Sequence, residues 1–169
     1  GSDFVQVIHP KAAGGWLGRA PHGHDPSAGL GRLRALHLAY NTSPALRAHP
    51  SVAAQVFDES EAFFGCTAGG VERFYLGADG EVQPCEFLNV SFGNVREEPF
   101  PAIFARMRAH FTQPGTNWLC CTEAASIARA VCERGLERTP VPWRVTRELI
   151  ASWDKGGETP LYRKLGIYR

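Results

Sequence analysis

Apolar residues near the start of the chain form one short continuous run rather than an alternating pattern. The run is Phe4-Val5-Gln6-Val7-Ile8, and Pro10 closes it. Strands of a parallel sheet are covered on both faces and therefore read as continuous apolar runs. The pattern predicts a buried strand over residues 4–8.

The following segment predicts a long loop and then a helix. Residues 11–31 are rich in Gly and Pro, which is typical of a loop. A helix over residues 31–41 is predicted from four residues at helical spacing: Leu33, Leu36, His37 and Tyr40. Residues 52–57 fit either a strand or a helix.

A clearer helical repeat lies past the middle of the chain. Five apolar residues fall at i, i+3, i+4, i+7 and i+11: Phe100, Ile103, Phe104, Met107 and Phe111. They define one apolar face of a helix that begins near Pro99. A second helix is predicted from an N-cap at Thr122 to a C′ glycine at Gly135, with Glu123 in its first turn. A short helix is predicted over residues 145–153 in the C-terminal tail.

Between these helical segments the sequence predicts a β-hairpin. Residues 72–76 and 81–85 flank Gly77-Ala78-Asp79-Gly80, where Asp-Gly supplies the positive φ of a tight turn. Pro84 cannot donate a hydrogen bond to a neighbouring strand, so the second strand lies at an edge or ends there. The expected fold is therefore α+β, a hairpin with packed helices.

The composition is that of a globular protein with little net charge. The 169 residues carry a formal net charge of +1, and Lys and Arg are scattered along the chain. This balance argues against nucleic acid and anionic membrane surfaces as partners. No apolar run approaches the ~20 residues that cross a bilayer, and no signal-peptide pattern is present, so we expect a cytoplasmic protein.

The five cysteines are Cys66, Cys85, Cys120, Cys121 and Cys132. Their odd number, the adjacent pair and the lack of a secretory pattern argue against a disulfide framework. In a reducing compartment, clustered cysteines are more often metal ligands or core residues.

Two of the cysteines stand on either side of the predicted hairpin. The pattern is Cys66, thirteen residues, Gly80, four residues, Cys85. A hairpin returns the chain on itself and can bring two thiolates to one point, which is the first requirement of a metal site. Taken without their surroundings, two cysteines near a hairpin are more often buried core residues than metal ligands.

Short motifs around this spacing resemble the SPASM domain and the shorter twitch domain, the auxiliary iron–sulfur domains of many radical S-adenosylmethionine enzymes. The similar motifs are Ala68-Gly69, Phe74-Tyr75-Leu76, Asp79-Gly80, Pro84-Cys85 and Phe92-Gly93-Asn94-Val95. The resemblance covers roughly residues 60–111. It implies that Cys66 and Cys85 bind an iron–sulfur cluster of the [4Fe–4S] type, which about four thiolates hold.

The adjacent pair Cys120 and Cys121 supplies the next candidates. Both precede the predicted N-cap, where helix N–H groups and the helix dipole favour a thiolate, so at least one is expected to be the third ligand. The alternative is that Cys120 packs as a small hydrophobic residue. Cys132 would lie about 15 Å along a regular helix from Cys121, so a core position suits it better than a ligand position. The fourth ligand stays open.

Two features differ from the complete family pattern. No run matches the Cys-x(2)-Cys-x(5)-Cys-x(3)-Cys that supplies a second cluster in SPASM domains, so the resemblance points to one cluster. The chain also lacks the Cys-x(3)-Cys-x(2)-Cys loop that binds the cofactor-cleaving cluster. The opening strand and the loop at residues 14–18 look like the last strand and exit of a parallel α/β barrel, cut from a longer chain. This chain should be inactive by itself.

Two groups of polar residues are weaker candidates. His22-Gly23-His24-Asp25 could bind zinc, but a surface segment is the better interpretation in a Gly- and Pro-rich loop without a second ligand pair. Four glutamates form a second group: Glu59, Glu61, Glu97 and Glu98. They could be paired carboxylates of a site, but solvated charges at helix ends explain them as well.

The sequence therefore predicts an α+β, twitch-like domain preceded by a remnant of a parallel α/β barrel. The expected segments are residues 1–50, 51–135 and 136–169. The expected function is binding one auxiliary cluster that supports substrate binding or electron transfer in an oxidoreductase. Its partners would be the upstream barrel, which binds S-adenosylmethionine, and a peptide or small-molecule substrate. A structural zinc domain and a metal-free interaction module are the alternatives.

Overall fold

The N-terminal part of the chain is a β–α–β unit. In the computed structural model, which describes residues 1–17 and 29–168, strand β1 (Phe4–Val7) pairs in parallel with β2 (Ser51–Ala54). Helix α1 (Leu30–Thr42) lies between them in the sequence and packs against β2. Short 3-10 turns η1 (Gly14–Trp16) and η2 (Pro44–Leu46) flank α1, and α2 (Gln55–Asp58) follows β2. The segment with ambiguous periodicity is thus a strand that turns directly into a helix.

The first strand pairs in parallel as predicted, but the prediction that it is buried is wrong. Phe4, Val5 and Ile8 are each more than 40% exposed. Within the described residues the sheet has only two strands, so both faces of β1 remain largely open to solvent. The apolar run of β1 is typical of a parallel sheet with both faces covered, and the described residues do not supply elements that cover these faces.

The hairpin lies in the second part of the molecule and is shorter than predicted. Strand β3 (Tyr75–Leu76) pairs antiparallel with β4 (Val82–Gln83), and Pro84 follows the end of β4 as expected. Residues 92–95 run along the other side of β4. The N–H of Val82 donates to the carbonyl of Gly93 at 2.9 Å, and the N–H of Phe92 donates to that of Val82 at 2.8 Å. The Phe92-Gly93-Asn94-Val95 motif is therefore a third extended segment beside the hairpin.

Gly80 is the position in the hairpin where glycine is required. Its φ is +91°, which side chains with a Cβ rarely adopt. A Cβ there would also lie 2.5 Å from Oδ1 of Asn94. The turn thus allows the extended segment at residues 92–95 to approach β4 closely.

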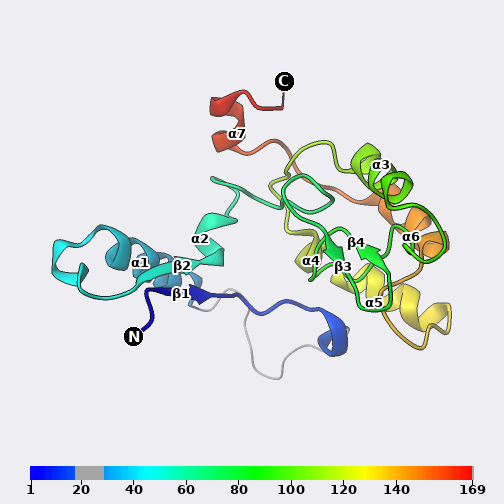
Figure 1. The fold of residues 1–169 in the computed structure, drawn as a ribbon, viewed down its shortest axis with the longest axis horizontal. Helices are drawn as coiled ribbons and strands as arrows, with labels where there is room; N and C mark the ends of the chain where they lie inside the picture. Colours follow the sequence, from blue (N-terminus) through cyan, green and yellow to red (C-terminus); the bar gives the residue numbers. More distant parts are fainter. Residues whose placement is uncertain (18–28, 169) are drawn as a thin grey trace.

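The helices that follow the hairpin in the chain lie around it, except for the last one, which lies apart near the C-terminus (Figure 1). Their bounds are α3 (Phe100–His110), α4 (Leu119–Thr122), α5 (Ala124–Glu133), α6 (Trp143–Leu149) and α7 (Pro160–Leu165), with the 3-10 turn η3 (Ile150–Ser152) after α6. The predicted apolar face of α3 is confirmed, since Ile103, Met107 and the C-cap Phe111 are buried in the core.

The predicted start of the second helix is wrong. Thr122 ends α4 instead of capping α5, and Glu123 is the N-cap residue of α5. The cysteine pair is therefore inside a one-turn helix rather than in front of a long one. The predicted end is confirmed: Gly135 has φ +61°, and the N–H groups of Gly135 and Leu136 reach back to the carbonyls of Cys132 and Val131. This is a Schellman motif.

The C-terminal tail is part of the core of the hairpin region. Val141 forms a bridge with Val90, and Val145, Ile150 and Trp153 are buried against the same cluster as α3. The predicted short helix is present as α6, which starts two residues earlier, followed by η3, and α7 is an additional helix that the pattern did not predict. The α+β class is thus confirmed.

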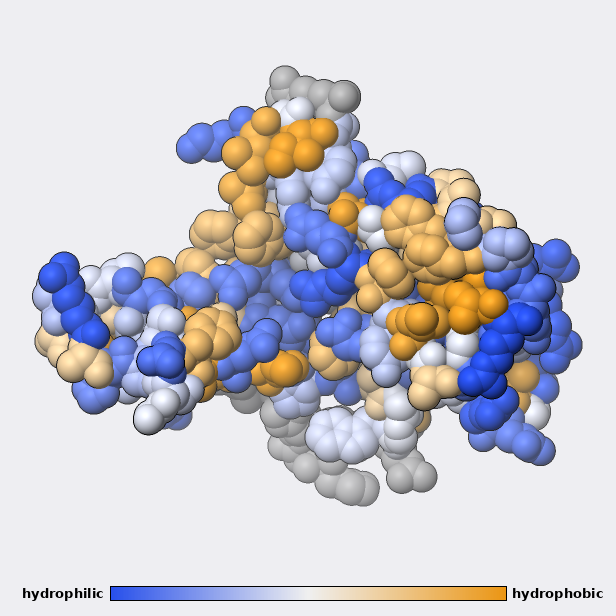
Figure 2. Space-filling model, in the orientation of Figure 1, coloured by the Kyte–Doolittle hydropathy of each residue, from blue (hydrophilic) through white to orange (hydrophobic). Residues whose placement is uncertain are grey.

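Apolar side chains also reach the surface of the hairpin region. Figure 2 shows them over the hairpin and α3, and the exposed ones include Phe74, Leu76 and Val95. None of the helices in the described residues has both the length and the hydropathy needed to span a bilayer.

Candidate metal centre

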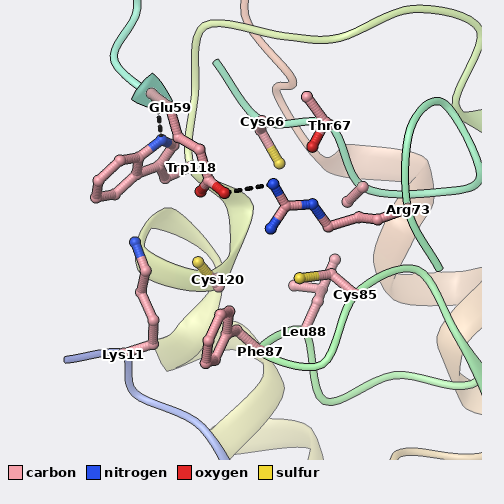
Figure 3. A pocket seen from close by; sticks show the side chains of 11 residues that line it. Lys11, Glu59, Cys66, Thr67, Arg73, Cys85, Phe87, Leu88, Trp118 and Cys120 are labelled. Atoms are coloured by element: carbon pink, nitrogen blue, oxygen red, sulfur yellow. Dashed lines mark hydrogen bonds and ion pairs between the residues drawn. The ribbon is translucent and has the colours of Figure 1, made fainter. Parts of the chain in front are cut away.

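Three cysteines from distant parts of the sequence line one pocket. Figure 3 shows the sulfur atoms of Cys66, Cys85 and Cys120 around the same space. The pocket holds about 340 Å³ of empty space, open solvent included. Its lining is completed by Lys11, Glu59, Thr67, Ala68, Arg73, Phe87, Leu88 and Trp118.

The backbone holds Cys66 rigidly between α2 and the hairpin. Its N–H donates to the carbonyl of Gly115 at 2.7 Å, and the N–H of Gly115 donates back at 3.1 Å. The backbone N–H groups of Ala68 and Leu119 hydrogen-bond its sulfur. These N–H groups stabilise negative charge on the sulfur, as a metal-bound thiolate requires.

Cys85 follows the second strand of the hairpin. The backbone N–H of Phe87 hydrogen-bonds its sulfur, and its thiol donates to Oε2 of Glu86 at 3.1 Å. The N–H of Gly69 donates to the carbonyl of Pro84 at 2.8 Å, which ties the Cys85 segment to the Cys66 segment. Gly69 has φ +83°, and a Cβ there would overlap the ring of Phe111. The Ala68-Gly69 motif thus allows the segments that carry Cys66 and Cys85 to lie close together.

The adjacent pair in α4 is divided by the helix. Cys120 lines the pocket, whereas the side chain of Cys121 is exposed, although the two thiols are hydrogen-bonded to each other. Cys132 lies on α5, away from the residues that line the pocket. The prediction that Cys132 is a core residue is wrong, because its side chain is exposed on the outer face of α5.

Three of the thiols are weak acids without a metal, two mainly through burial and one mainly through a hydrogen bond. Desolvation raises the pKa of Cys66, and it raises the pKa of Cys85 to about 12. In the adjacent pair, the hydrogen bond between the two thiols raises the pKa of Cys120 and lowers that of Cys121 to about 6. Metal binding at the pocket must therefore release protons, so its affinity should depend on pH.

Arg73 places a guanidinium beside two of the thiols. Figure 3 shows its side chain pointing into the space between Cys66 and Cys85. Arg73 is paired with Glu59 through Nη2, and its Nη1 lies 4.0 Å from Oε1 of Glu86. Its charge counteracts the rise in the pKa of both thiols.

The third side of the pocket is closed by Lys11 and Trp118. The ammonium of Lys11 lies 3.2 Å from the centroid of the Trp118 ring, and the indole N–H donates to the carbonyl of Glu59. Two buried polar atoms at the pocket, Nζ of Lys11 and Oγ1 of Thr67, have no hydrogen-bond partner among the described residues. Two donors without acceptors indicate that the pocket suits an anionic occupant.

The donor set fits an iron–sulfur cluster, which thiolates hold and N–H groups tune. The three thiols surround the pocket instead of converging on one point (Figure 3). Accordingly, the side chains of residues 1–17 and 29–168 contain no group of three or more His, Cys, Asp or Glu that could hold a single metal ion. Thiolates that bind separate iron atoms do not have to meet at one centre.

Sequence reasoning missed the charged residues of this pocket. Glu59 is not a simple solvated charge: its side chain is only 15% exposed, paired with Arg73 and hydrogen-bonded by Gln55. Arg73 lies within the hairpin motif, but no local pattern distinguishes it. Lys11 stands 55 residues before Cys66 in a predicted loop, so no sequence signal could have placed it here.

The other polar candidates do not form a site in the described residues. Glu61 and Glu97 are exposed, and Glu98 is paired with Arg106, whose Nη2 lies 2.6 Å from its Oε2. The His22-Gly23-His24-Asp25 segment lies outside the described residues.

Comparisons with known proteins agree with the motif. Residues 66–133 match the family described as SPASM, iron-sulfur cluster-binding domain. A segment of 49 residues is 45% identical to the "AdoMet-dependent heme synthase" of Nitratidesulfovibrio vulgaris strain Hildenborough. This match covers 29% of the chain and 13% of the heme synthase. No solved structure is significantly similar.

The predicted resemblance is thereby confirmed: residues 66–133 are similar to the SPASM iron–sulfur cluster-binding domain. All three pocket cysteines fall within the matching residues. The two charged residues Lys11 and Glu59 lie outside them.

Proposed function

We propose that this chain binds one auxiliary [4Fe–4S] cluster as the C-terminal part of a radical S-adenosylmethionine enzyme. The observation that carries the proposal is the pocket in which Cys66, Cys85 and Cys120 meet beside two cationic side chains. The negative charge of the thiolate ligands exceeds the positive charge of a [4Fe–4S] core, so the bound cluster is anionic, and Arg73 and Lys11 would offset part of that charge. The SPASM match over the same cysteines supports this ligand set.

We propose Cys121 as the fourth ligand. A cluster of this type takes about four thiolates, and three are in the pocket. Cys121 already forms a hydrogen bond with the thiol of Cys120, and its lowered pKa favours the thiolate form. Cys132 lies on a different helix and is not part of the proposed set.

The N-terminal unit supports a longer parent chain. Strands β1 and β2 are parallel and joined through α1, which is the connection of an α/β barrel. The exposed apolar residues of β1 would be covered by further strands and helices of that barrel. We therefore propose that residues 1–50 end the barrel that binds S-adenosylmethionine, that residues 51–135 form the cluster domain, and that residues 136–169 follow as its tail.

The proposed cluster would bind or orient a substrate, or carry an electron, during the reaction of the parent enzyme. The partial match to an AdoMet-dependent heme synthase does not select a substrate for this chain, so both peptides and small molecules stay within the proposal. All five cysteines are free thiols, which agrees with a reducing, cytoplasmic setting.

The test is anaerobic reconstitution of the 169-residue chain with iron and sulfide, followed by absorption spectroscopy and metal analysis. A broad band near roughly 400 nm with about four irons and four sulfides per chain is the expected result. A colourless protein with one zinc, or no bound metal, would overturn the proposal.

Cysteine variants make this test specific. Cys66→Ala and Cys85→Ala should each abolish the iron and the band, because each removes a thiolate of the pocket. Cys132→Ala is the matched control and should keep both, since its thiol is exposed on α5. Full iron content in Cys85→Ala would contradict the ligand assignment.

A further inference from the structure

Lys11 is a buried cation whose position the SPASM motif does not explain. The residue is 7% exposed, and its ammonium group rests on the face of Trp118. None of the described residues accepts a hydrogen bond from it. A buried ammonium without a charged partner is unfavourable, and an aromatic face compensates only part of that cost.

The loop that carries Lys11 is held in place on both sides. The N–H of His9 donates to Oε1 of Gln55 at 3.2 Å, and the N–H of Gly14 donates to Oδ1 of Asn89 at 2.8 Å. The first contact joins the loop to α2, and the second joins it to the segment after Cys85. The backbone on either side of Lys11 is therefore fixed beside the pocket that its side chain lines.

The carboxylates around the pocket do not neutralise Lys11. Glu59 lines the same pocket, but Arg73 engages it through a short ion pair. Glu86, on the far side, lies next to Arg73 and accepts from Cys85. The charge of Arg73 is thus balanced within the protein, while the charge of Lys11 faces the thiols of α4.

The positions of the two cations show the same division. Figure 3 shows the guanidinium of Arg73 between Cys66 and Cys85, and the ammonium of Lys11 on the side of Trp118 and Cys120. The two cations therefore act on opposite sides of the pocket. Only the side of Lys11 has unbalanced positive charge before the pocket is filled.

We propose that the ammonium of Lys11 balances the negative charge of the thiolate-bound auxiliary cluster and raises the reduction potential of that cluster. The proposal rests on the proposed function. One-electron reduction adds a negative charge to the cluster, and a nearby fixed cation favours the more negative state. Loss of the cation therefore shifts the equilibrium toward the oxidised cluster.

The same geometry links the two parts of the molecule. Lys11 belongs to the loop after β1, yet its electrostatic partner would be held by cysteines of the hairpin part and α4. Filling the pocket should therefore strengthen the attachment of the N-terminal unit, because the ammonium gains the anionic partner that it lacks in the metal-free chain.

The experiment compares Lys11→Met and Lys11→Arg with wild type in the reconstituted 169-residue chain. Redox titration followed by absorption and electron paramagnetic resonance gives the potential. For Lys11→Met we expect an equilibrium constant for reduction at least about tenfold lower, which is 59 mV for one electron. Lys11→Arg should restore most of this shift. Lys164→Met removes an exposed lysine of α7 and should leave the potential unchanged.

A second readout needs no cluster. In the metal-free chain, Lys11→Met should raise the thermal midpoint, because it replaces an unpaired buried ammonium by an apolar side chain of similar length. After reconstitution, the same variant should gain less stability than wild type. A gain equal to that of wild type would show that Lys11 does not contact the cluster.

The outcomes separate the two proposals. Wild type without iron would overturn the proposed function. Wild type with iron, together with Lys11→Met at full iron content and unchanged potential, would overturn the role of Lys11 alone. Loss of iron in Lys11→Met but not in Lys11→Arg supports the charge role, whereas equal loss in both variants with native circular dichroism contradicts it.

Discussion

The N-terminal unit and the hairpin part of this protein both contain elements that an apolar pattern predicts, but the packing of these elements is very different. Helix α1 has no buried residue, and the apolar residues of β1 are largely exposed. In α3, by contrast, Ile103 and Met107 are completely buried. Both segments were predicted from apolar spacing, and both formed the predicted element.

The difference shows that an apolar pattern specifies an element but not the layer that covers it. The face of α3 is covered by the extended segment after Cys85 and by the tail, which supply Phe92, Val141 and Val145. The N-terminal unit has α1 on β2 and little else among the described residues. Its stability should therefore come from pairing and local contacts, and that of the hairpin part from a shared core.

The largest effect is expected at two neighbouring thiols that differ only in packing. Cys120→Ala should abolish the cluster, because Cys120 lines the pocket. Cys121→Ala should retain iron but release it faster to a chelator, because three pocket thiols remain. Iron content and the rate of bleaching with a chelator measure both. Equal iron loss in the two variants would contradict the prediction that Cys120, which lines the pocket, is the more important ligand.

A core substitution tests the comparison between the two parts directly. Ile103→Ala should lower the free energy of unfolding by about 2–5 kcal/mol, since it opens a cavity in a fully buried site. Leu38→Ala, at a 47% exposed position of α1, should cost about 0.5 kcal/mol or less. Urea denaturation followed by circular dichroism gives both values. A large cost for Leu38→Ala would show that a further layer covers α1 in solution.

A smaller, pH-dependent effect is expected at the end of α3. Burial, and then the charge of Lys155, lowers the pKa of His110 from 6.5 to about 4. The unfolded chain thus binds a proton between these values that the folded chain does not, so stability falls as the pH drops from about 6.5 to 4. Since His110 is only half buried, the contribution is about 1–2 kcal/mol after allowance for screening.

Urea midpoints at pH 4.5 and pH 7 measure this contribution. His110→Gln should reduce the difference between the two midpoints, and His49→Gln, which removes an exposed imidazole after η2, is the control. An unchanged difference in His110→Gln would assign the pH dependence to other groups.

Local chemistry accounts for the predictions that were confirmed. The Asp-Gly turn, the proline after β4, the apolar face of α3 and the glycine after α5 each depend on a few neighbouring residues. The start of α5 was wrong because Thr122 was judged as a cap from its own neighbours. The tertiary contacts of Leu119 and Cys120 instead wind residues 119–122 into a separate turn.

The sequence by itself determined β1, the hairpin, α1, α3 and the pair of cysteines around the hairpin, because spacing and turn chemistry are local. It also limited the third thiol to an adjacent pair. Only the tertiary structure decided that Cys120 faces the pocket and that Cys132 is exposed. The same holds for Lys11, Glu59 and Arg73, whose convergence depends on how the loop after β1, α2 and the hairpin pack together. Long-range packing of this kind leaves no periodic signal along the chain.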